Sequence, residues 1–184
     1  SDVYKRQVVG MVGTIDEISS AVGMAPAAGG LTLVVIGQSP HVDDGWLGVS
    51  LYARNMAGAP DAAPPPVDLE AELRNGLFVQ RQIATGLVSA AHDISDGGLA
   101  VAIAEMCIAG GLGASIDVPD TGNIVGWAFG EDQARYVVTT SAPDELLAAA
   151  HDAGVPAAAI GSTRTEAELQ FGNENAISVE WISK

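Results

Sequence analysis

The segment LVSAAHDISDGGLAVAIAEMCIA, residues 87–109, most constrains what this chain can fold into. It joins an apolar run of strand length to an apolar run of helical length through a short turn rich in Asp, Ser and Gly. We expect a strand over 87–92, then the turn, then a helix from about Gly97 to Ala109. The inner face of this helix would carry Leu99, Ile103 and Met106.

Other strand patterns flank this unit. The run VVGMVGTIDEI at 8–18 is strand-like, and LTLVVIG at 31–37 has the length and β-branching of a buried strand. Further strands are expected at 113–118 and 134–140. Near the C-terminal end, we expect short strands in AAAIGS, AELQF and AISVEWI.

The remaining helices show their boundaries in the sequence. A helix is expected from Asp68, as N-cap, to about Thr85, with Leu69, Leu73, Leu77 and Ala84 on one face. The segment 59–68 before it is rich in proline and predicts an extended connection, and 39–58 predicts a loop leading to a short helix. Another helix is expected at 141–154, where Ser141 and Asp144 have capping-box spacing.

These patterns predict an α+β fold with a mixed β-sheet and helices packed on one face, because the last strands look like hairpin pairs. The domain would span 8–184, and the first seven residues, SDVYKRQ, read as a tag, tail or artefact. Since a strand-like run begins abruptly at residue 8, we expect a piece of a longer protein, truncated at both ends.

Charge and cysteine content narrow the possible functions. The 184 residues include 23 acidic and 8 basic ones, a formal charge of −15, which disfavours binding to nucleic acid or to an anionic membrane surface. No apolar run reaches the roughly 20 residues of a membrane span. The single cysteine, Cys107, excludes a disulfide framework and indicates a reducing compartment, with Cys107 itself as a small core residue.

The turn carries groups suited to a magnesium-bound phosphate. Asp93 could hold Mg²⁺ through its carboxylate, and Ser95 could donate to a phosphate or a metal-bound water. Gly97 and Gly98 would let the backbone approach a ligand at the helix N-terminus, and Asp96 would be the N-cap. The alternative is that these residues only cap the helix and make the turn. His92 would then hydrogen-bond to a neighbouring loop.

The motifs AHDISDGGLAVAIAEM and FGEDQARYVVT, at 91–106 and 129–139, together resemble the C-terminal domain of phosphoribosylformylglycinamidine synthases. VVGMVGTIDEI, GWLGVSLY and PPPVDLEAE agree in order and spacing, so the resemblance runs from about residue 8 to about residue 172. The wider superfamily includes aminoimidazole ribonucleotide synthetase, selenophosphate synthetase and thiamine-phosphate kinase. PPPVDL and GEDQAR favour the formylglycinamidine enzyme over these relatives.

The resemblance implies a cytoplasmic ATP-dependent ligase that converts formylglycinamide ribonucleotide to its amidine with ammonia from a glutaminase subunit. A small accessory subunit and the rest of the synthetase chain would be further partners. By position, Asp93 would bind Mg²⁺, and Ser95, Gly97 and Gly98 would contact ATP or a structural ADP.

The segment Gly130, Glu131, Asp132 and Gln133 would be an interface or ligand loop, with Asp132 where the family more often has serine. No catalytic residue is assigned within this chain. Because a glycine–asparagine pair and the first half of the synthetase would lie upstream, we expect the isolated chain to be inactive. The alternatives are a structural half-domain without its own nucleotide site, or a related synthetase or kinase of the wider superfamily.

Overall fold

The computed structural model of the chain describes residues 10, 12–15, 17–18, 21–38, 47–56, 58, 63–120 and 122–184. The first seven residues, predicted to be a tag, tail or artefact, lie outside this set. The strand expected at 8–18 is wrong for its described residues, none of which lies in a strand. A strand needs a hydrogen-bonding neighbour, and no strand in the described part of the chain pairs with this segment.

A seven-stranded mixed sheet organises the described residues, in the order β2-β4-β1-β5-β3-β6-β7. Only β3 and β6 run parallel to each other; the other neighbouring strands are antiparallel. The α+β class with a mixed sheet is therefore confirmed. The strands are β1 (Thr32–Ile36), β2 (Ala90–Asp93), β3 (Gly113–Ile116), β4 (Tyr136–Thr140), β5 (Ala157–Arg164), β6 (Glu168–Phe171) and β7 (Ile177–Ser178).

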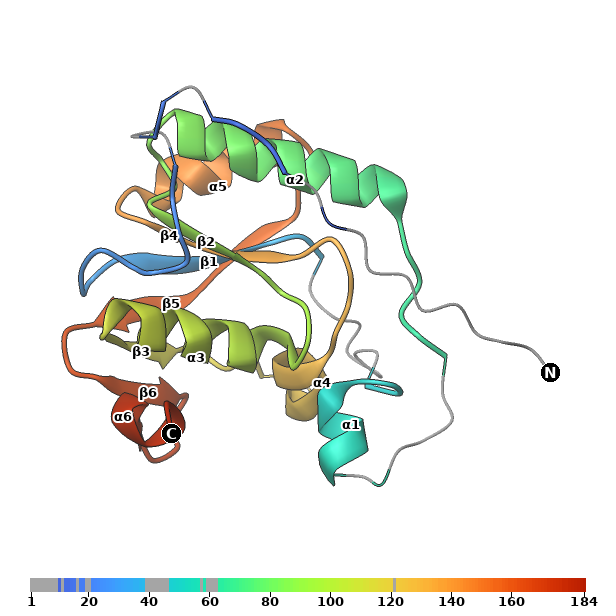
Figure 1. Ribbon diagram of the computed structural model, residues 1–184, viewed down its shortest axis with the longest axis vertical. Coiled ribbons are helices and arrows are strands. Elements are labelled where there is room, and N and C mark those ends of the chain that lie inside the picture. Colours follow the sequence, from blue (N-terminus) through green and yellow to red (C-terminus); the bar gives the residue numbers. More distant parts are fainter. Residues whose placement is uncertain are drawn as a thin grey trace.

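Helices cover both faces of this sheet, not one as the sequence predicted (Figure 1). The alternation of side chains along β1 explains why. Leu33 and Val35 pack toward α3 and α4, whereas Val34 and Ile36 pack toward α2 and α5. The helices are α1 (Leu51–Met56), α2 (Leu69–Ala84), α3 (Gly98–Gly110), α4 (Ile124–Phe129), α5 (Pro143–Asp152) and α6 (Val179–Ile182).

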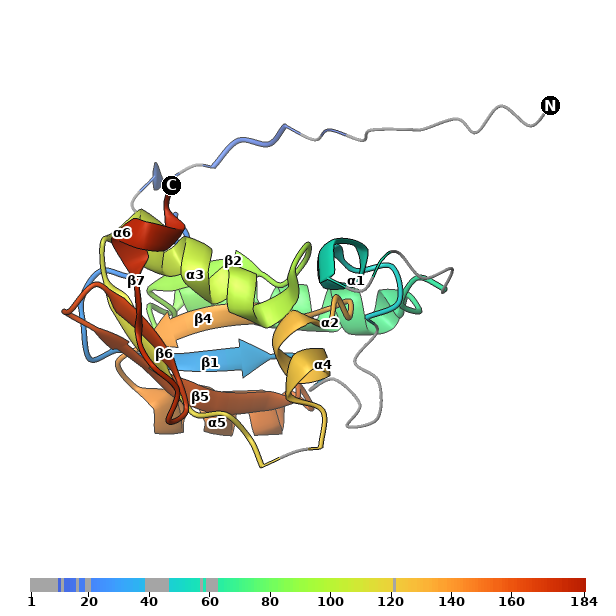
Figure 2. The same cartoon turned by 90° about the horizontal axis from the view of Figure 1, so that it is seen from below.

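The C-terminal strands differ from a series of hairpins. β3 lies between β5 and β6, so these two do not pair, although β6 and β7 do form an antiparallel pair. Within AISVEWI only Ile177 and Ser178 are in a strand. Helix α6 follows at once because Val179 is buried in the core formed with α3, beside which α6 lies in Figure 2.

Helix α3 matches the prediction closely. Leu99, Ile103 and Met106 are fully buried against the sheet, and Cys107 is buried beside them. Burial raises the pKa of the Cys107 thiol to about 11. The apolar run in the sequence therefore identifies the inner helix of the domain.

Helix α2 has the predicted N-cap but an unexpected inner face. The Asp68 carboxylate accepts from the backbone N–H groups of Glu70 and Ala71, each at 3.0 Å. Its leucines at 69, 73 and 77 are exposed. The buried residues of α2 are Asn75, Phe78, Val79 and Gln82.

The capping box expected at Ser141 is wrong. Helix α5 has Ala142 as its N-cap, without a side-chain hydrogen bond, and Pro143 occupies the first turn. Pro143 fixes the backbone at the helix start, and the Ala142 N–H donates to Thr140 Oγ1 at 3.0 Å. No helix in the described part of the chain is both long and apolar enough to cross a bilayer.

Candidate functional site

Asp93 ends strand β2 and points outward. Its backbone pairs with Tyr136 of β4, and its side chain is 67% exposed. The next residue, Ile94, is buried and donates its N–H to the Arg135 carbonyl at 2.9 Å. The Asp93 carboxylate is thus fixed at the rim of the sheet and lies outside the core.

The two glycines of the turn have left-handed backbones, with φ of 82° at Gly97 and 71° at Gly98. A Cβ on Gly98 would lie 2.7 Å from the Phe129 carbonyl carbon, and one on Gly97 would lie 2.5 Å from a methyl of Val101. Only glycine fits both positions. The close approach that these glycines permit is to the end of α4 and to the first turn of α3.

The N-terminus of α3 is held by Glu131, so the prediction of Asp96 as N-cap is wrong. Gly97 is the N-cap, and its N–H donates to Glu131 Oε1 at 2.8 Å. The same oxygen accepts from the Leu51 N–H of α1 at 2.8 Å. A carboxylate from the GEDQAR segment therefore sits where the positive end of the α3 dipole favours an anion.

The rest of the GEDQAR segment packs within the domain. Gly130 ends α4, donating its N–H to the Gly126 carbonyl at 2.9 Å. Gln133 Nε2 donates to the Glu131 carbonyl at 3.4 Å. Asp132 Oδ2 lies 3.8 Å from Arg135 Nη1. These contacts join the segment to α4 and fix its shape.

Helix α2 hydrogen-bonds to the end of this segment at Ala134, which has a left-handed backbone with φ of 59°. Ala134 donates its N–H to Glu72 Oε1 at 2.8 Å and accepts from Asn75 Nδ2 at 2.9 Å. An alanine in this conformation is strained and persists only where its surroundings hold it. The hydrogen bonds from Glu72 and Asn75 of α2 keep Ala134 in this conformation.

A cleft of about 210 Å³ opens beside Asp93. Three of the predicted site residues line it, namely Asp93, Ser95 and Gln133. Gly97, Gly98, Gly130, Glu131 and Asp132 are not among its lining residues. The structure thus brings the carboxylate and hydroxyl of the turn to one opening and places the glycines and Glu131 behind it.

Glu72 and Tyr136 also line this cleft. The pKa of Tyr136 is raised by burial and, in addition, by the negative charges of Glu72 and Asp93. Two carboxylates and one guanidinium, that of Arg135, therefore line this small opening.

The donor set is compatible with magnesium shared with a phosphate ligand. Among the described residues, no three His, Cys, Asp or Glu side chains converge as a complete metal cage. Mg²⁺ commonly uses only one or two carboxylates and keeps waters or substrate phosphates as its other ligands. Asp93 could supply such a carboxylate, with Glu72 as a second through the oxygen that does not accept from the Ala134 N–H.

His92 is held by side chains and not by a loop. Its Nε2 lies 2.8 Å from Glu105 Oε2 on α3, and its Nδ1 lies 3.3 Å from Asp93 Oδ1. The expected hydrogen bond exists, but the partner is a helix carboxylate. His92 thereby ties the end of β2 to α3 and orients Asp93.

Sequence reasoning missed Glu72, Arg135 and Tyr136 as cleft residues. In the sequence, Tyr136 and Arg135 belong to a strand pattern and a motif that do not by themselves indicate a cleft. Glu72 could have been found from its spacing with Asn75 and Val79, which places all three on one side of α2.

The family model described as "AIR synthase related protein, C-terminal domain" matches residues 29–171. The chain therefore belongs to this family. Its sequence is 49% identical to the phosphoribosylformylglycinamidine synthase subunit PurL of Methylocella silvestris, over 95% of this chain and 23% of that protein. For the same subunit of Azorhizobium caulinodans, the identity is 46% over 98% of this chain and 24% of the relative. The chain thus spans about a quarter of the length of these curated relatives.

Solved structures agree in fold. PurL from Thermotoga maritima, complexed with FGAR, superimposes with a TM-score of 0.75 at 21% identity, covering 91% of this chain and 30% of that one. HypE from E. coli gives a TM-score of 0.60 at 18% identity, covering 86% of this chain and 52% of that one. At such identities the likeness shows the fold alone.

Proposed function

We propose that this chain is the C-terminal domain of the second half of the synthetase subunit of phosphoribosylformylglycinamidine synthase. The observation that carries the proposal is the 49% identity to a PurL subunit over 95% of the chain. The parent would be an ATP-dependent carbon–nitrogen ligase of purine biosynthesis. It would convert formylglycinamide ribonucleotide to the amidine, using ammonia derived from glutamine.

In this proposal the cleft beside Asp93 faces a magnesium-bound nucleotide, either ATP or a structural ADP. PurL from T. maritima has been solved with ATP, ADP and AMPPCP, which supports nucleotide binding in the family. When bound, ATP would supply the phosphoryl group that makes the formamide oxygen a leaving group. The chain's own contribution is to orient Asp93 for Mg²⁺, present the Ser95 hydroxyl, and form the tight left-handed turn that Gly97 and Gly98 permit.

The partners would be the rest of the synthetase chain, a glutaminase subunit and a small accessory subunit, all in the cytoplasm. A PurLQS assembly from T. maritima contains a chain of the same fold, with a TM-score of 0.72. Since the 184 residues span about a quarter of the curated relatives, we expect no turnover from the chain by itself.

A second candidate is a structural half-domain that binds no nucleotide. The observation that favours it is the Glu131 carboxylate, which already accepts the Gly97 N–H at 2.8 Å. A phosphate at the α3 N-terminus would have to displace this carboxylate or approach from the Asp93 side.

Titration of magnesium–ATP into the full-length synthetase that carries this sequence separates the two candidates. Asp93→Ala should weaken nucleotide binding by about tenfold or more, because a charge-assisted contact is lost. Asp96→Ala is the matched control, since Asp96 is exposed on the same turn but does not line the cleft. Equal nucleotide occupancy in wild type and in Asp93→Ala would instead support the half-domain without a nucleotide site.

A further inference from the structure

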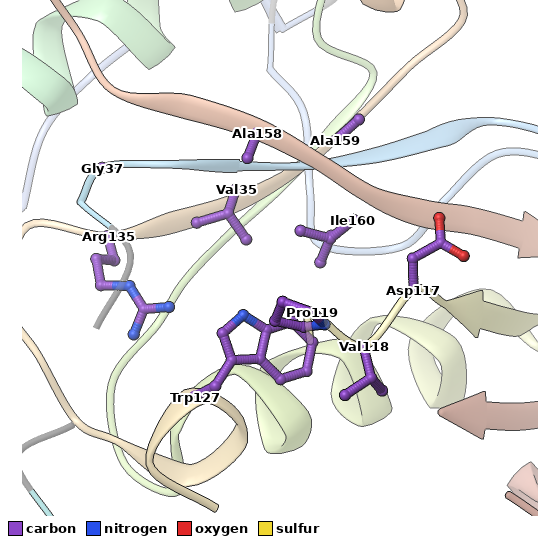
Figure 3. Close-up of a pocket in the computed structure, with 10 residues that line it drawn as sticks. All are labelled: Val35, Gly37, Asp117, Val118, Pro119, Trp127, Arg135, Ala158, Ala159 and Ile160. Carbon is purple, nitrogen blue, oxygen red and sulfur yellow. The ribbon is translucent and has the colours of Figure 1, made fainter. Parts of the chain in front are cut away.

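A second cavity, of about 320 Å³, lies between β1, β5 and helix α4. Its wall is mostly apolar, and Figure 3 shows the Trp127 ring facing the strands across the opening. The apolar lining residues include Val35, Val118, Pro119, Trp127 and Ile160. Asp117 also lines the cavity, and Figure 3 shows its carboxylate directed away from Arg135 and Trp127. The volume is within the range of cavities that hold small organic ligands.

The Arg135 guanidinium forms one wall of this cavity and points toward Trp127 (Figure 3). Its side chain is only 1% exposed. The Nε and Nη1 groups have no hydrogen-bond partner in the part of the chain that the structure describes. Asp132 Oδ2 lies 3.8 Å from Nη1, close enough for an ion pair but too far for a hydrogen bond.

The buried Arg135 N–H groups, without acceptors among the described residues, lower the stability of the folded domain. Burial lowers the pKa of Arg135, and the charge of Asp132 raises it, but a guanidinium remains protonated in proteins. Buried N–H groups without acceptors are rare in native structures and call for an explanation. An acceptor that enters the cavity would satisfy one of these two groups.

We propose that this cavity binds a small organic anion whose carboxylate or phosphate accepts from Arg135 and whose flat apolar part lies against Trp127. The forked N–H groups of arginine match the oxygens of either anion. Trp127 and the surrounding aliphatic side chains supply the apolar contact surface. The anion takes its charge compensation from Arg135 despite the net charge of −15 on the chain.

The inference does not rest on nucleotide binding at Asp93. Arg135 lines both openings, but Trp127, Val35 and Ile160 line only the larger one, and Asp93 lines only the smaller. Asp93→Ala should therefore leave binding in the larger cavity unchanged. Failure of the proposed ligase function and failure of this second site would be observed separately.

The test uses Trp127 fluorescence in the 184-residue chain carrying Trp46→Phe and Trp181→Phe, so that Trp127 is its sole tryptophan. The probes are phenyl phosphate and benzoate, which distinguish the two anion types, and benzyl alcohol as the neutral control. We expect saturable binding of at least one anion, and affinity for benzyl alcohol lower by about tenfold or more because it lacks the charge-assisted bonds.

Two kinds of variant check where the probe binds. Arg135→Met should weaken binding of the anion by about tenfold or more, since it retains a side chain of similar length without the charge. Ala158→Leu should also weaken it by filling the cavity while leaving Arg135 in place. Ala159→Leu is the matched control: both alanines line the cavity, but Figure 3 shows the Ala158 side chain pointing into it and the Ala159 side chain pointing away.

The Ala158→Leu result stands even if Arg135→Met does not fold, and the thermal unfolding of each variant establishes which ones can be compared. Absence of saturable binding by either anion would overturn the proposal. So would equal affinity for benzyl alcohol, or equal effects of Ala158→Leu and Ala159→Leu.

Discussion

Helices α2 and α3 lie on opposite sides of the sheet and use their inner faces differently. Helix α3 buries only apolar residues, among them Leu99, Ile103 and Met106. Helix α2 exposes its leucines and buries Asn75 and Gln82 beside Phe78 and Val79. The difference follows from their tasks, because α3 fills the core whereas α2 also holds the strained Ala134 of the candidate site through hydrogen bonds.

The strongest test of this contrast is leucine truncation on each helix. Leu99→Ala on α3 should lower the free energy of unfolding by roughly 2–5 kcal/mol, because it leaves a cavity in a fully packed core. Leu73→Ala on α2, where the side chain is 65% exposed, should change it by less than about 0.5 kcal/mol. Urea denaturation measures both. Equal losses would mean that α2 packs its leucines inward in solution.

Alkaline pH should destabilise the fold through Cys107 of helix α3. The pKa of Cys107 is raised from 9.0 to about 11 in the folded state, so the native thiol resists losing its proton. The stabilisation from the protonated thiol is fully present below pH 9 and is lost as the pH rises to about 11. This loss should lower the free energy of unfolding by about 2–3 kcal/mol.

Urea denaturation between pH 8 and pH 11 should therefore show a steeper loss of stability in the wild type than in Cys107→Ala. Tyr136, whose pKa is also raised, remains in both proteins and cancels in the comparison. Parallel curves for the two proteins would contradict the assignment to Cys107.

Removing the Asn75 side chain of α2 should lower the free energy of unfolding by a comparable or smaller amount. Asn75→Ala deletes the donor to the buried Ala134 carbonyl and should cost about 1–3 kcal/mol. Gln80→Ala, at an exposed position of the same helix, should cost less than about 0.5 kcal/mol. If Asn75→Ala also weakens magnesium–ATP binding by the full-length synthetase, α2 supports the cleft as well as the fold.

The smallest effect concerns helix caps. Asp68→Ala should cost about 1 kcal/mol because two N–H groups at the start of α2 lose their acceptor. Ser141→Ala should have almost no effect, since α5 begins without a side-chain cap. Thermal unfolding of the two variants compares them directly, and a larger loss for Ser141→Ala would restore the capping box that its spacing predicted.

Helices α1, α2, α3 and α5 and most strands could be predicted from the sequence because their signals are local, whereas α4 and α6 were not predicted. The apolar stripe of α3, the cap at Asp68 and the buried strand β1 each depend on a few neighbouring residues. The position of β3 between β5 and β6 could not be predicted, since strand order depends on contacts between distant segments. Val179 likewise starts a helix because of its burial against α3, which AISVEWI does not encode by itself.

The candidate site was predictable only in part for the same reason. Asp93 and Ser95 do share an opening, as the spacing of the turn predicted. The role of Glu131 was not predictable, because its partners at residues 51 and 97 are far away in the chain. Asp96 has the residue type of an N-cap, but the left-handed Gly97 takes that position, and Glu131 is the acceptor there.

The single Glu131 oxygen has a mechanical consequence. Two segments, the start of α1 and the turn before α3, depend on the same acceptor. Any anion that accepts from the Gly97 N–H in place of Glu131 would displace the Glu131 side chain. The Leu51 N–H at the start of α1 would then lose its acceptor at the same time. Greater mobility of α1 would then indicate that another anion has replaced Glu131 as the acceptor of the Gly97 N–H.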